Sequence, residues 1–356
     1  MKKEQISRYL GESSLRVIEA MQKIDANAKG LLFIVDDMGR LEGTLTDGDI
    51  RRGIIKTGNL NGRVSDFMNK SPKYVYRKDM HIAQEYMADM KITALPVLNM
   101  QNKISDIIFA SEDKTKENNE KKNELGQVPI VIMAGGKGTR LYPYTKILPK
   151  PLIPIGDIPI MERIINRFTG YGVRDVYATV NYRKNMIISY FSDQQMDVNI
   201  HYVEENEPLG TAGGLRLIDK EFECPFFLTN CDVLIKANYA DIYRHHIESG
   251  NEITMVVAMK NIMVPYGVVC SSENGTVVGM EEKPKLSYLV NTGLYVLNPD
   301  VLLQIPENTF FHMTDLTNKL LENKRKVGVY PISEDSFLDM GEFEEMRRME
   351  EKLNGN

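Results

Sequence analysis

In the C-terminal two thirds of the chain, apolar runs typical of strands alternate with apolar positions spaced as on one face of a helix. Val128–Met133 is a short apolar run before glycine-rich sequence, as expected of a buried strand. Apolar positions that share one face of a helix follow it: Met161, Ile164, Ile165 and Phe168. More strands are expected at Val176–Val180, around Val198, Ile200 and Tyr202, and at Phe226–Thr229. Strands that alternate with helices predict an α/β domain with a doubly wound, largely parallel sheet, in which ligands bind beyond the carboxyl ends of the strands.

The N-terminal third contains the same pattern of apolar and polar positions in two consecutive copies. An offset of 63 residues aligns Ile34 with Val97, Leu41 with Ile104, Leu45 with Ile108 and Thr46 with Phe109. Each copy begins with a segment of helical period, and a strand, a polar turn and a second strand follow it. Two such units can pack their sheets together and bury surface that neither could bury alone.

Residues 5–112 resemble a tandem pair of CBS domains, which are α+β regulatory modules that often bind adenosine ligands between their repeats. In that family a strand ends in Gly-x-x-Thr/Ser-x-x-Asp, and Gly43–Asp49 fits this pattern. The resemblance implies that Thr46 and Asp49 contact an adenine nucleotide or another nucleotide. The residues leave a second interpretation open, because Thr46 also suits the N-cap of a helix that begins near Asp47.

The second copy departs from the pattern. Asp106 stands where Gly is expected, Phe109 where Thr or Ser is expected, and Glu112 where Asp is expected. We therefore expect at most one competent ligand site, and a structural or dimerising role fits as well as regulation. Because CBS pairs commonly associate, a homodimer or higher homo-oligomer is expected.

A glycine-rich loop follows the first strand of the C-terminal block, over Ala134–Leu141. Its three glycines let the backbone turn tightly, so that N–H groups can face phosphate oxygens. Arg140 adds a fixed fork of donors suited to phosphate. A P-loop is excluded because Gly138 follows Lys137, and a dinucleotide fingerprint is excluded because Leu141 stands where its last glycine would be. The loop by itself predicts a phosphate nearby or a simple turn.

The string AGGKGTRLYPYTKILPKPLIPIG, from Ala134 to Gly156, resembles the signature of the sugar-phosphate nucleotidyltransferases. Prolines on both sides of Lys150 restrict the backbone there. The resemblance implies a Rossmann-like mixed sheet and catalytic roles for Arg140 and Lys150. It also implies nucleotide contacts from these residues: Ala134, Gly135, Gly136, Gly138 and Thr139.

Later segments match the same family in order. Leu209–Ala212 resembles a loop that borders base and sugar, so that Gly210 and Thr211 would bind nucleotide. Glu282 and Lys283 resemble the Glu-Lys-Pro segment, whose Glu accepts from sugar hydroxyls and whose Lys pairs with the sugar phosphate as a catalytic cation. A further sugar-binding segment corresponds to Asn291, Thr292 and Gly293.

Two carboxylates occupy the positions of the family's Mg2+ ligands. Asp232 follows a predicted strand in Asn230-Cys231-Asp232, although many members have Gly where Cys231 stands. Asp339 belongs to Phe337–Gly341, which resembles the family's late Asp-x-Gly motif. Two carboxylates completed by phosphate oxygens and waters suit Mg2+, which rarely takes a cage made of protein alone.

The resemblance implies in-line attack of a sugar 1-phosphate on the α-phosphorus of a nucleoside triphosphate, giving a nucleotide sugar and pyrophosphate. We expect GTP and glucosamine or N-acetylglucosamine 1-phosphate, in surface-glycan or legionaminic acid-type biosynthesis. Guanylyl transfer to mannose or heptose 1-phosphate, and uridylyl or thymidylyl transfer, stay open. A hypothesis of another class is a non-catalytic regulatory protein that senses nucleotides; the presence of Arg140, Lys150, Asp232 and Asp339 argues against it.

The net charge and the composition limit which classes of molecule the protein is expected to bind and where it is expected to be located. The net charge of −5 argues against a nucleic-acid binder. The odd count of 3 cysteines matches no zinc pattern and favours a reducing, cytoplasmic compartment. No apolar run approaches the roughly 20 residues that span a bilayer. We divide the chain into a CBS pair at 1–112, a charged linker at 113–127 and a nucleotidyltransferase domain at 128–356.

Overall fold

The computed structural model describes residues 3–27, 29–110 and 123–354. The chain divides into two compact units. The first unit comprises Met1–Lys114, Met259–Val290 and Ser333–Asp335, and the second comprises Thr115–Ala258, Asn291–Ile332 and Ser336–Asn356. Most of the expected linker at 113–127 lies outside the described residues, so the three-part division stays a prediction.

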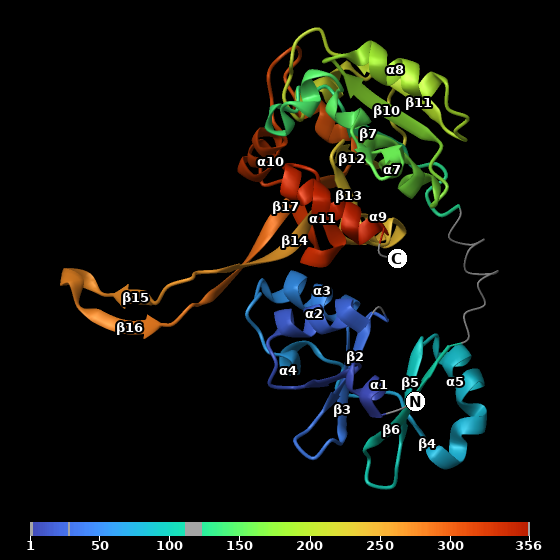
Figure 1. Ribbon diagram of the computed structural model, residues 1–356, viewed down its shortest axis with the longest axis vertical. Coiled ribbons are helices and arrows are strands. Elements are labelled where there is room, and N and C mark those ends of the chain that lie inside the picture. Colours follow the sequence, from blue (N-terminus) through green and yellow to red (C-terminus); the bar gives the residue numbers. More distant parts are fainter. Residues whose placement is uncertain (1–2, 28, 111–122, 355–356) are drawn as a thin grey trace. The chain divides into compact units, whose positions relative to one another are not determined.

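The first unit contains two three-stranded sheets with one topology (Figure 1). In each, the first strand is parallel to the second and the second is antiparallel to the third. The strands are β1 (Leu10–Glu12), β2 (Leu31–Val35) and β3 (Leu41–Thr46), then β4 (Val75–Tyr76), β5 (Ala94–Leu98) and β6 (Ile104–Phe109). The accompanying helices are α1 (Lys3–Ser7), α2 (Val17–Asn27), α3 (Asp47–Thr57), α4 (Val64–Phe67), η1 (Arg77–Ile82) and α5 (Ala83–Met90).

The strand registers confirm the offset of 63 residues between the copies. Leu31 pairs with Thr46 in the first hairpin, and Ala94 pairs with Phe109 in the second. Both hairpins also shift register at the same place, after Ile34 and after Val97. A shared apolar cluster joins the two copies through Ile6, Leu31, Phe33 and Ile107. The sequence repeat thus corresponds to two copies of one structural unit. The assignment of these copies to the CBS family stays a prediction.

Thr46 is the N-cap of α3. Its hydroxyl accepts a hydrogen bond from the Asp49 N–H at 3.1 Å, and the Asp49 carboxylate accepts from the Thr46 N–H at 2.9 Å. The Thr46 hydroxyl also donates to the Asp49 carboxylate at 2.7 Å. This capping box confirms the structural interpretation of Thr46. The predicted nucleotide contacts of Thr46 and Asp49 stay predictions, as does the homo-oligomer.

A seven-stranded mixed sheet forms the centre of the second unit, in the order β11-β10-β7-β12-β17-β14-β18 (Figure 1). The first four strands are parallel and β17 is antiparallel to β12. Their bounds are β7 (Ile130–Met133), β10 (Asp175–Val180), β11 (Asn199–Glu204), β12 (Phe226–Asn230), β14 (Ile253–Met263), β17 (Lys285–Leu297) and β18 (Val327–Ser333). The strands expected from the sequence at β7, β10, β11 and β12 are confirmed.

Helices cover both faces of this sheet. Phe226 and Leu228 of β12 belong to one cluster with Leu316 and Leu320 of α10 (Met313–Glu322). Phe227, which points to the opposite face, packs against Phe168 of α7 (Ile160–Thr169) and Tyr239 of α9 (Tyr239–Ser249). The expected α/β sheet with two covered faces is therefore confirmed, and α8 (Lys184–Ser192) and α11 (Phe343–Asn354) complete the α-helices of this unit among the described residues.

Short elements connect the sheet to its surroundings. β13 (Val233–Ile235) pairs antiparallel with β19 (Phe337–Asp339), and β8 (Pro154–Ile155) pairs with β9 (Ile158–Pro159). Between β14 and β17 the chain forms the hairpin of β15 (Val268–Ser271) and β16 (Val277–Glu281), which belongs to the first unit.

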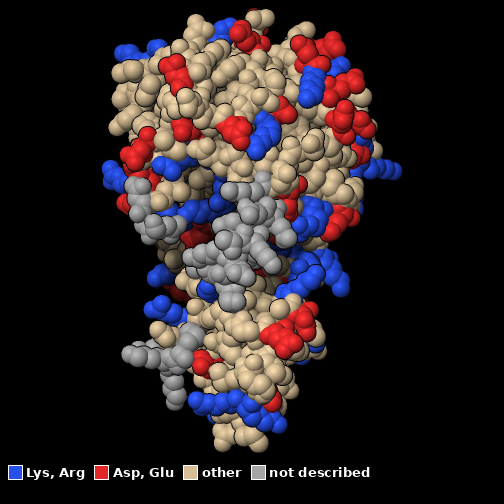
Figure 2. Space-filling view, turned by 90° about the vertical axis from the view of Figure 1, so that its right-hand side faces the viewer, with Lys and Arg blue, Asp and Glu red and all other residues tan. Residues whose placement is uncertain are grey.

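The face of the molecule drawn in Figure 2 carries Lys, Arg, Asp and Glu side chains interspersed over its surface. Among the described helices, none combines the length and the apolar character that a membrane crossing requires.

Candidate functional site

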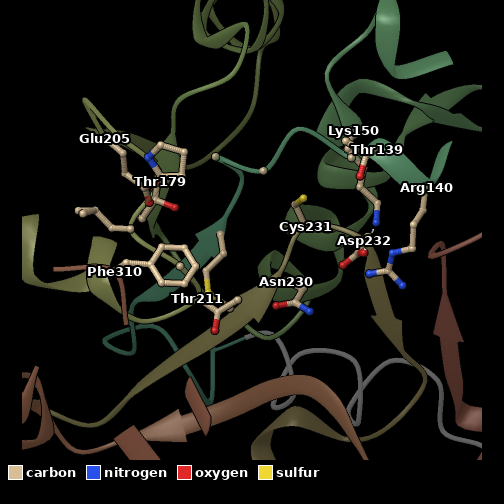
Figure 3. A pocket seen from close by; sticks show the side chains of 17 residues that line it. Thr139, Arg140, Lys150, Thr179, Glu205, Thr211, Asn230, Cys231, Asp232 and Phe310 are labelled. Carbon is tan, nitrogen blue, oxygen red and sulfur yellow. Dashed lines mark hydrogen bonds and ion pairs between the residues drawn. The ribbon is translucent and has the colours of Figure 1, made fainter. Parts of the chain in front are cut away.

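A cavity of about 350 Å³ opens in the second unit beyond the carboxyl ends of the parallel strands (Figure 3). It lies beside Met133 at the end of β7, Thr179 in β10 and Asn230 at the end of β12. Most residues predicted to bind nucleotide or act in catalysis line it, together with the predicted metal ligand Asp232: Gly135, Gly136, Gly138, Thr139, Arg140, Lys150, Gly210 and Thr211. The tertiary fold thus brings together segments that are far apart in the sequence, and the roles of these residues stay predictions.

The glycine-rich loop passes close to Lys150. Gly138 has a φ of 62°, and a Cβ added there would lie 2.9 Å from Thr145 Cγ2 and 3.0 Å from Lys150 Cβ. Position 138 therefore requires glycine for two reasons. Its backbone is left-handed, and a side chain there would collide with Thr145 and Lys150. Buried Leu141 anchors the short 3-10 helix η2 (Thr139–Leu141) that follows. Ala134 is buried before the loop, its N–H bonded to the Thr179 carbonyl at 2.9 Å, and it does not line the cavity.

Lys150 and Asp232 form an ion pair within the cavity. The Lys150 Nζ donates to the Asp232 carboxylate, and both side chains are largely buried. Pro149 and Pro151 flank Lys150 in the short 3-10 helix η4 (Lys150–Leu152). Removing one partner of such a pair leaves an uncompensated charge in a poorly solvated place, so each partner depends on the other.

Asp339 is held next to Asp232 by the β13–β19 ladder. Val233 pairs with Asp339, and the Met340 N–H donates to the Asp232 carbonyl at 2.9 Å. Burial, and then the nearby Asp232 and Glu345 carboxylates, raise the pKa of Asp339 to about 6, while Lys150 and Arg140 oppose the shift. Two carboxylates whose negative charges are only partly balanced are a suitable place for a divalent cation.

The donor set fits a hard divalent cation such as Mg2+. Both side chains offer hard carboxylate oxygens, and the described part of the chain contains no group of three or more His, Cys, Asp or Glu side chains that could by itself hold a metal ion. Phosphate oxygens and waters would therefore have to complete the coordination, as is usual for Mg2+.

A second cavity of about 270 Å³ adjoins the first and shares Arg140, Thr211, Asn230 and Asp232 with it. The sugar-binding residues expected from the sequence, Asn291, Thr292 and Gly293, line it together with Asp339 and His312. The Thr292 hydroxyl donates to the Val256 carbonyl at 2.8 Å, and Gly293 has a φ of 82° beside Asn230. The shared residues make Asp232 a boundary between two compartments.

Glu282 and Lys283 follow β16 in the first unit and are exposed. Lys283 has a positive φ of 47°, and its Nζ lies 3.9 Å from the Glu282 carboxylate. The expected contact of Glu282 with sugar hydroxyls and that of Lys283 with the sugar phosphate stay predictions.

Several residues that line the cavities were missed by the sequence interpretation, among them Glu205, Phe310 and His312. Glu205 follows the end of β11, so the carboxyl-end rule for strands could have indicated it. Phe310 and His312 come from a loop that gives no local signal of a site. That loop is bonded to the Gly210 segment, because the Ala212 N–H donates to the Phe311 carbonyl at 2.9 Å.

Cys231 is expected to resist alkylation in the native protein. Its side chain is buried, and burial together with the Asp232 charge raises the pKa of its thiol to about 12, so little thiolate exists at pH 8. Cys270 is exposed and serves as the internal control. Peptide mass spectrometry after brief iodoacetamide treatment should show Cys270 alkylated at least about 100-fold faster than Cys231. If Cys231 and Cys270 were alkylated at equal rates in the native protein as well as in urea, the buried position of Cys231 would be contradicted.

Comparisons with known proteins show what the C-terminal part of the chain is similar to. The family described as Nucleotidyl transferase matches residues 129–355. Curated relatives named mannose-1-phosphate guanyltransferase include one from Aspergillus oryzae, 36% identical over 184 residues, and one from Schizosaccharomyces pombe, 38% identical over 184 residues. Each match covers 49% of this chain and 50% or 51% of the relative, so the chain spans about half the length of the curated relatives it matches.

A solved structure of a protein titled a putative glucose-1-phosphate thymidylyltransferase, from Bacillus anthracis, resembles the chain with a TM-score of 0.50. The two are 21% identical, and the likeness covers 63% of this chain and 94% of the other. It supports the mixed α/β fold.

Proposed function

This chain belongs to the nucleotidyl transferase family, and on that premise we propose that it transfers a nucleotidyl group from a nucleoside triphosphate to a sugar 1-phosphate. The observation that carries the proposal is the pair of adjoining cavities with Arg140 and Asp232 at their boundary. One cavity begins at a glycine loop suited to phosphate, and the other is lined by Asn291, Thr292 and Gly293. Such an arrangement can hold two phosphorylated substrates with their phosphates adjacent.

The reaction joins two anions, so positioning and charge neutralisation are the main requirements. An oxygen of the sugar phosphate forms a bond to the α-phosphorus, and the bond from that phosphorus to the bridging oxygen breaks, releasing pyrophosphate. The loop N–H groups and Arg140 would bind the departing pyrophosphate, and Lys150 would reduce repulsion between the substrates. The sugar phosphate is already mostly deprotonated at pH 7, so no side chain is needed as a general base.

Asp232 and Asp339 would hold a Mg2+ ion. When bound, such an ion would neutralise charge on the phosphate oxygens and stabilise the pentacoordinate transition state. Without it, the two carboxylates would repel the substrates, which makes turnover dependent on the divalent cation.

We propose GTP as the nucleotide. The names of the curated relatives support guanylyl transfer and favour mannose 1-phosphate as the sugar. Glucosamine and N-acetylglucosamine 1-phosphate, the sugars expected from the motifs, stay in the proposal as alternatives.

A substrate matrix tests the proposal. GTP, ATP, UTP, CTP and dTTP are each combined with the 1-phosphates of mannose, heptose, glucose, glucosamine and N-acetylglucosamine in the presence of Mg2+, and pyrophosphate release is measured. We expect the highest kcat/KM for GTP with mannose or a glucosamine 1-phosphate, and loss of turnover when the metal is chelated. Absence of pyrophosphate with every pair would refute nucleotidyl transfer.

A further inference from the structure

Three neighbouring strands of the central sheet pass from one unit to the other. β14 belongs to the second unit up to Ala258 and to the first unit from Met259, and β17 leaves the first unit at Val290. β18 enters the first unit at its last residue, since Ser333–Asp335 belongs there. We refer to each of these points as a crossing. The three strands are adjacent at one edge of the sheet, in the order β17-β14-β18, so the crossings lie at that edge.

β14 and β17 keep one pairing register through their crossings. In the first unit the Ser287 hydroxyl donates to the Asn261 side chain at 2.9 Å, and in the second unit the Thr292 hydroxyl donates to the Val256 carbonyl at 2.8 Å. The two pairs lie five residues apart on both strands, as an unbroken antiparallel ribbon requires. A displacement of this ribbon in the first unit is therefore transmitted along both strands into the second.

The first repeat copy packs on this ribbon where it crosses. Met259, the first residue of β14 beyond the crossing, is 2% exposed and belongs to one buried apolar cluster with Ile18 and Met21 of α2. Leu289 of β17 packs against the same cluster. A cavity of about 190 Å³ beside it is lined by α2, by the end of β14 and by Ser333–Asp335. All three crossings thus adjoin the first copy.

The second repeat copy lacks a comparable contact with the ribbon. Its buried cluster is centred on Met87 of α5 and on Leu95 and Val97 of β5. Within the part of the chain that the structure describes, neither this cluster nor the apolar side chains packed against it include a residue of β14 or β17. The contact with the strands is therefore specific to the first copy, and the second copy provides a control of the same architecture.

The crossings lie next to one of the two cavities in the chain. The nucleotide cavity is built on β7, β10, β12 and the loops that follow them, all within the second unit. Asn291, by contrast, is the first residue of the second unit after β17 crosses, and it lines the second cavity with Thr292 and Gly293. The Asn291 side chain accepts from the Gly293 N–H at 3.1 Å and donates to the Tyr295 hydroxyl at 2.5 Å. A shift of β17 therefore reaches the second cavity first.

We propose that the first repeat copy positions Asn291–Gly293 for the sugar 1-phosphate by holding β14 and β17 at their crossings. The inference rests on the proposed function and gives the N-terminal unit a share in sugar-phosphate affinity. Ile18 and Met21 are then positioning residues, and the exposed Glu282 and Lys283 belong to the same unit as they do. Misplacing a positioning group by about 1 Å can cost about 100-fold in rate. Loss of the contact should therefore affect the sugar phosphate and leave nucleotide binding intact.

The experiment compares wild-type protein with Met21→Ala in the full chain, using GTP and mannose 1-phosphate, or the pair that the substrate matrix identifies. Met21→Ala should raise KM for the sugar phosphate at least about tenfold and change KM for GTP by less than about twofold. Met21→Leu conserves the volume of the side chain and should stay within about twofold of wild-type values. Met87→Ala is the matched control, because it removes the same buried side chain from the second copy. Equal effects on both KM values, or the same increase in Met87→Ala, overturn the proposal.

Hydrogen–deuterium exchange tests the contact independently of turnover. In Met21→Ala, amides in peptides from Lys285–Leu297 should exchange at least about tenfold faster than in wild-type protein, whereas Met87→Ala should leave them unchanged. Unchanged exchange in Met21→Ala overturns the contact whatever the substrates are. Faster exchange in a protein that releases no pyrophosphate from any pair retains the contact and refutes its role toward a sugar phosphate, so the two failures are distinguishable.

Discussion

Replacement of Lys150 by alanine is expected to lower kcat by at least about a hundredfold. The Lys150 ammonium is buried in the cavity and pairs with Asp232, at the boundary where the two substrates would meet. Its removal leaves the carboxylates and the phosphates without their nearest buried cation, and the loss of one preorganised electrostatic contact costs about 10²–10³ in rate. Pyrophosphate release at saturating substrates measures the effect.

Lys146→Ala is the matched control for Lys150→Ala. Lys146 lies in the same segment but is exposed and does not line the cavities, so its loss should change kcat by less than about twofold. Circular dichroism of each variant checks that the fold persists, because breaking a buried pair also costs stability. A folded Lys150→Ala protein with nearly wild-type turnover would contradict the assignment of this cavity as the reaction site.

Replacement of Asp232 by asparagine is expected to lower turnover at least about a hundredfold and to raise the Mg2+ concentration needed for half-maximal rate. Asparagine retains the size of the side chain but removes the charge that pairs with Lys150 and that, with Asp339, would hold the metal ion. A titration of initial rate against MgCl2, for wild-type and variant protein, measures both changes.

Asp193→Asn controls for the loss of a negative charge, since Asp193 is exposed at the end of α8 and lines neither cavity. It should leave the Mg2+ dependence unchanged. An Asp232→Asn protein whose Mg2+ requirement equals that of wild-type protein would exclude Asp232 as a metal ligand.

Local features of the chain carried most of the correct predictions. The strands near Val176 and Phe226 and the helix through Phe168 followed from periodicity, which depends only on which faces of an element are buried. The repeat was predicted from an offset of 63 residues. The two hairpins follow this offset in their strand pairing and in the positions of their register shifts. The glycine-rich loop was recognisable as a tight turn because glycine can adopt backbone conformations that other residues avoid, as the positive φ of Gly138 shows.

Contacts between distant segments were not predictable in this way. The Lys150–Asp232 pair joins residues from separate motifs, and no spacing rule states that a lysine between prolines meets a carboxylate after a strand. Phe310 lines the cavity, and its loop is held beside the distant Gly210 segment by backbone hydrogen bonds. Glu205 was passed over because a single carboxylate at the end of a strand has no motif to distinguish it from a solvated surface charge.

The sequence by itself determined the elements, the repeat and the glycine-rich loop, since each is readable from local patterns of residues. Its motifs also led to the prediction that Arg140, Lys150 and Asp339 supply the charges of the proposed reaction. The tertiary structure decided that Asp232 stands between two cavities and that Glu205 is enclosed by Gly135 and Gly214. The physical reason is that burial and charge pairing arise where parallel strands end together, and that proximity is created only when the sheet forms.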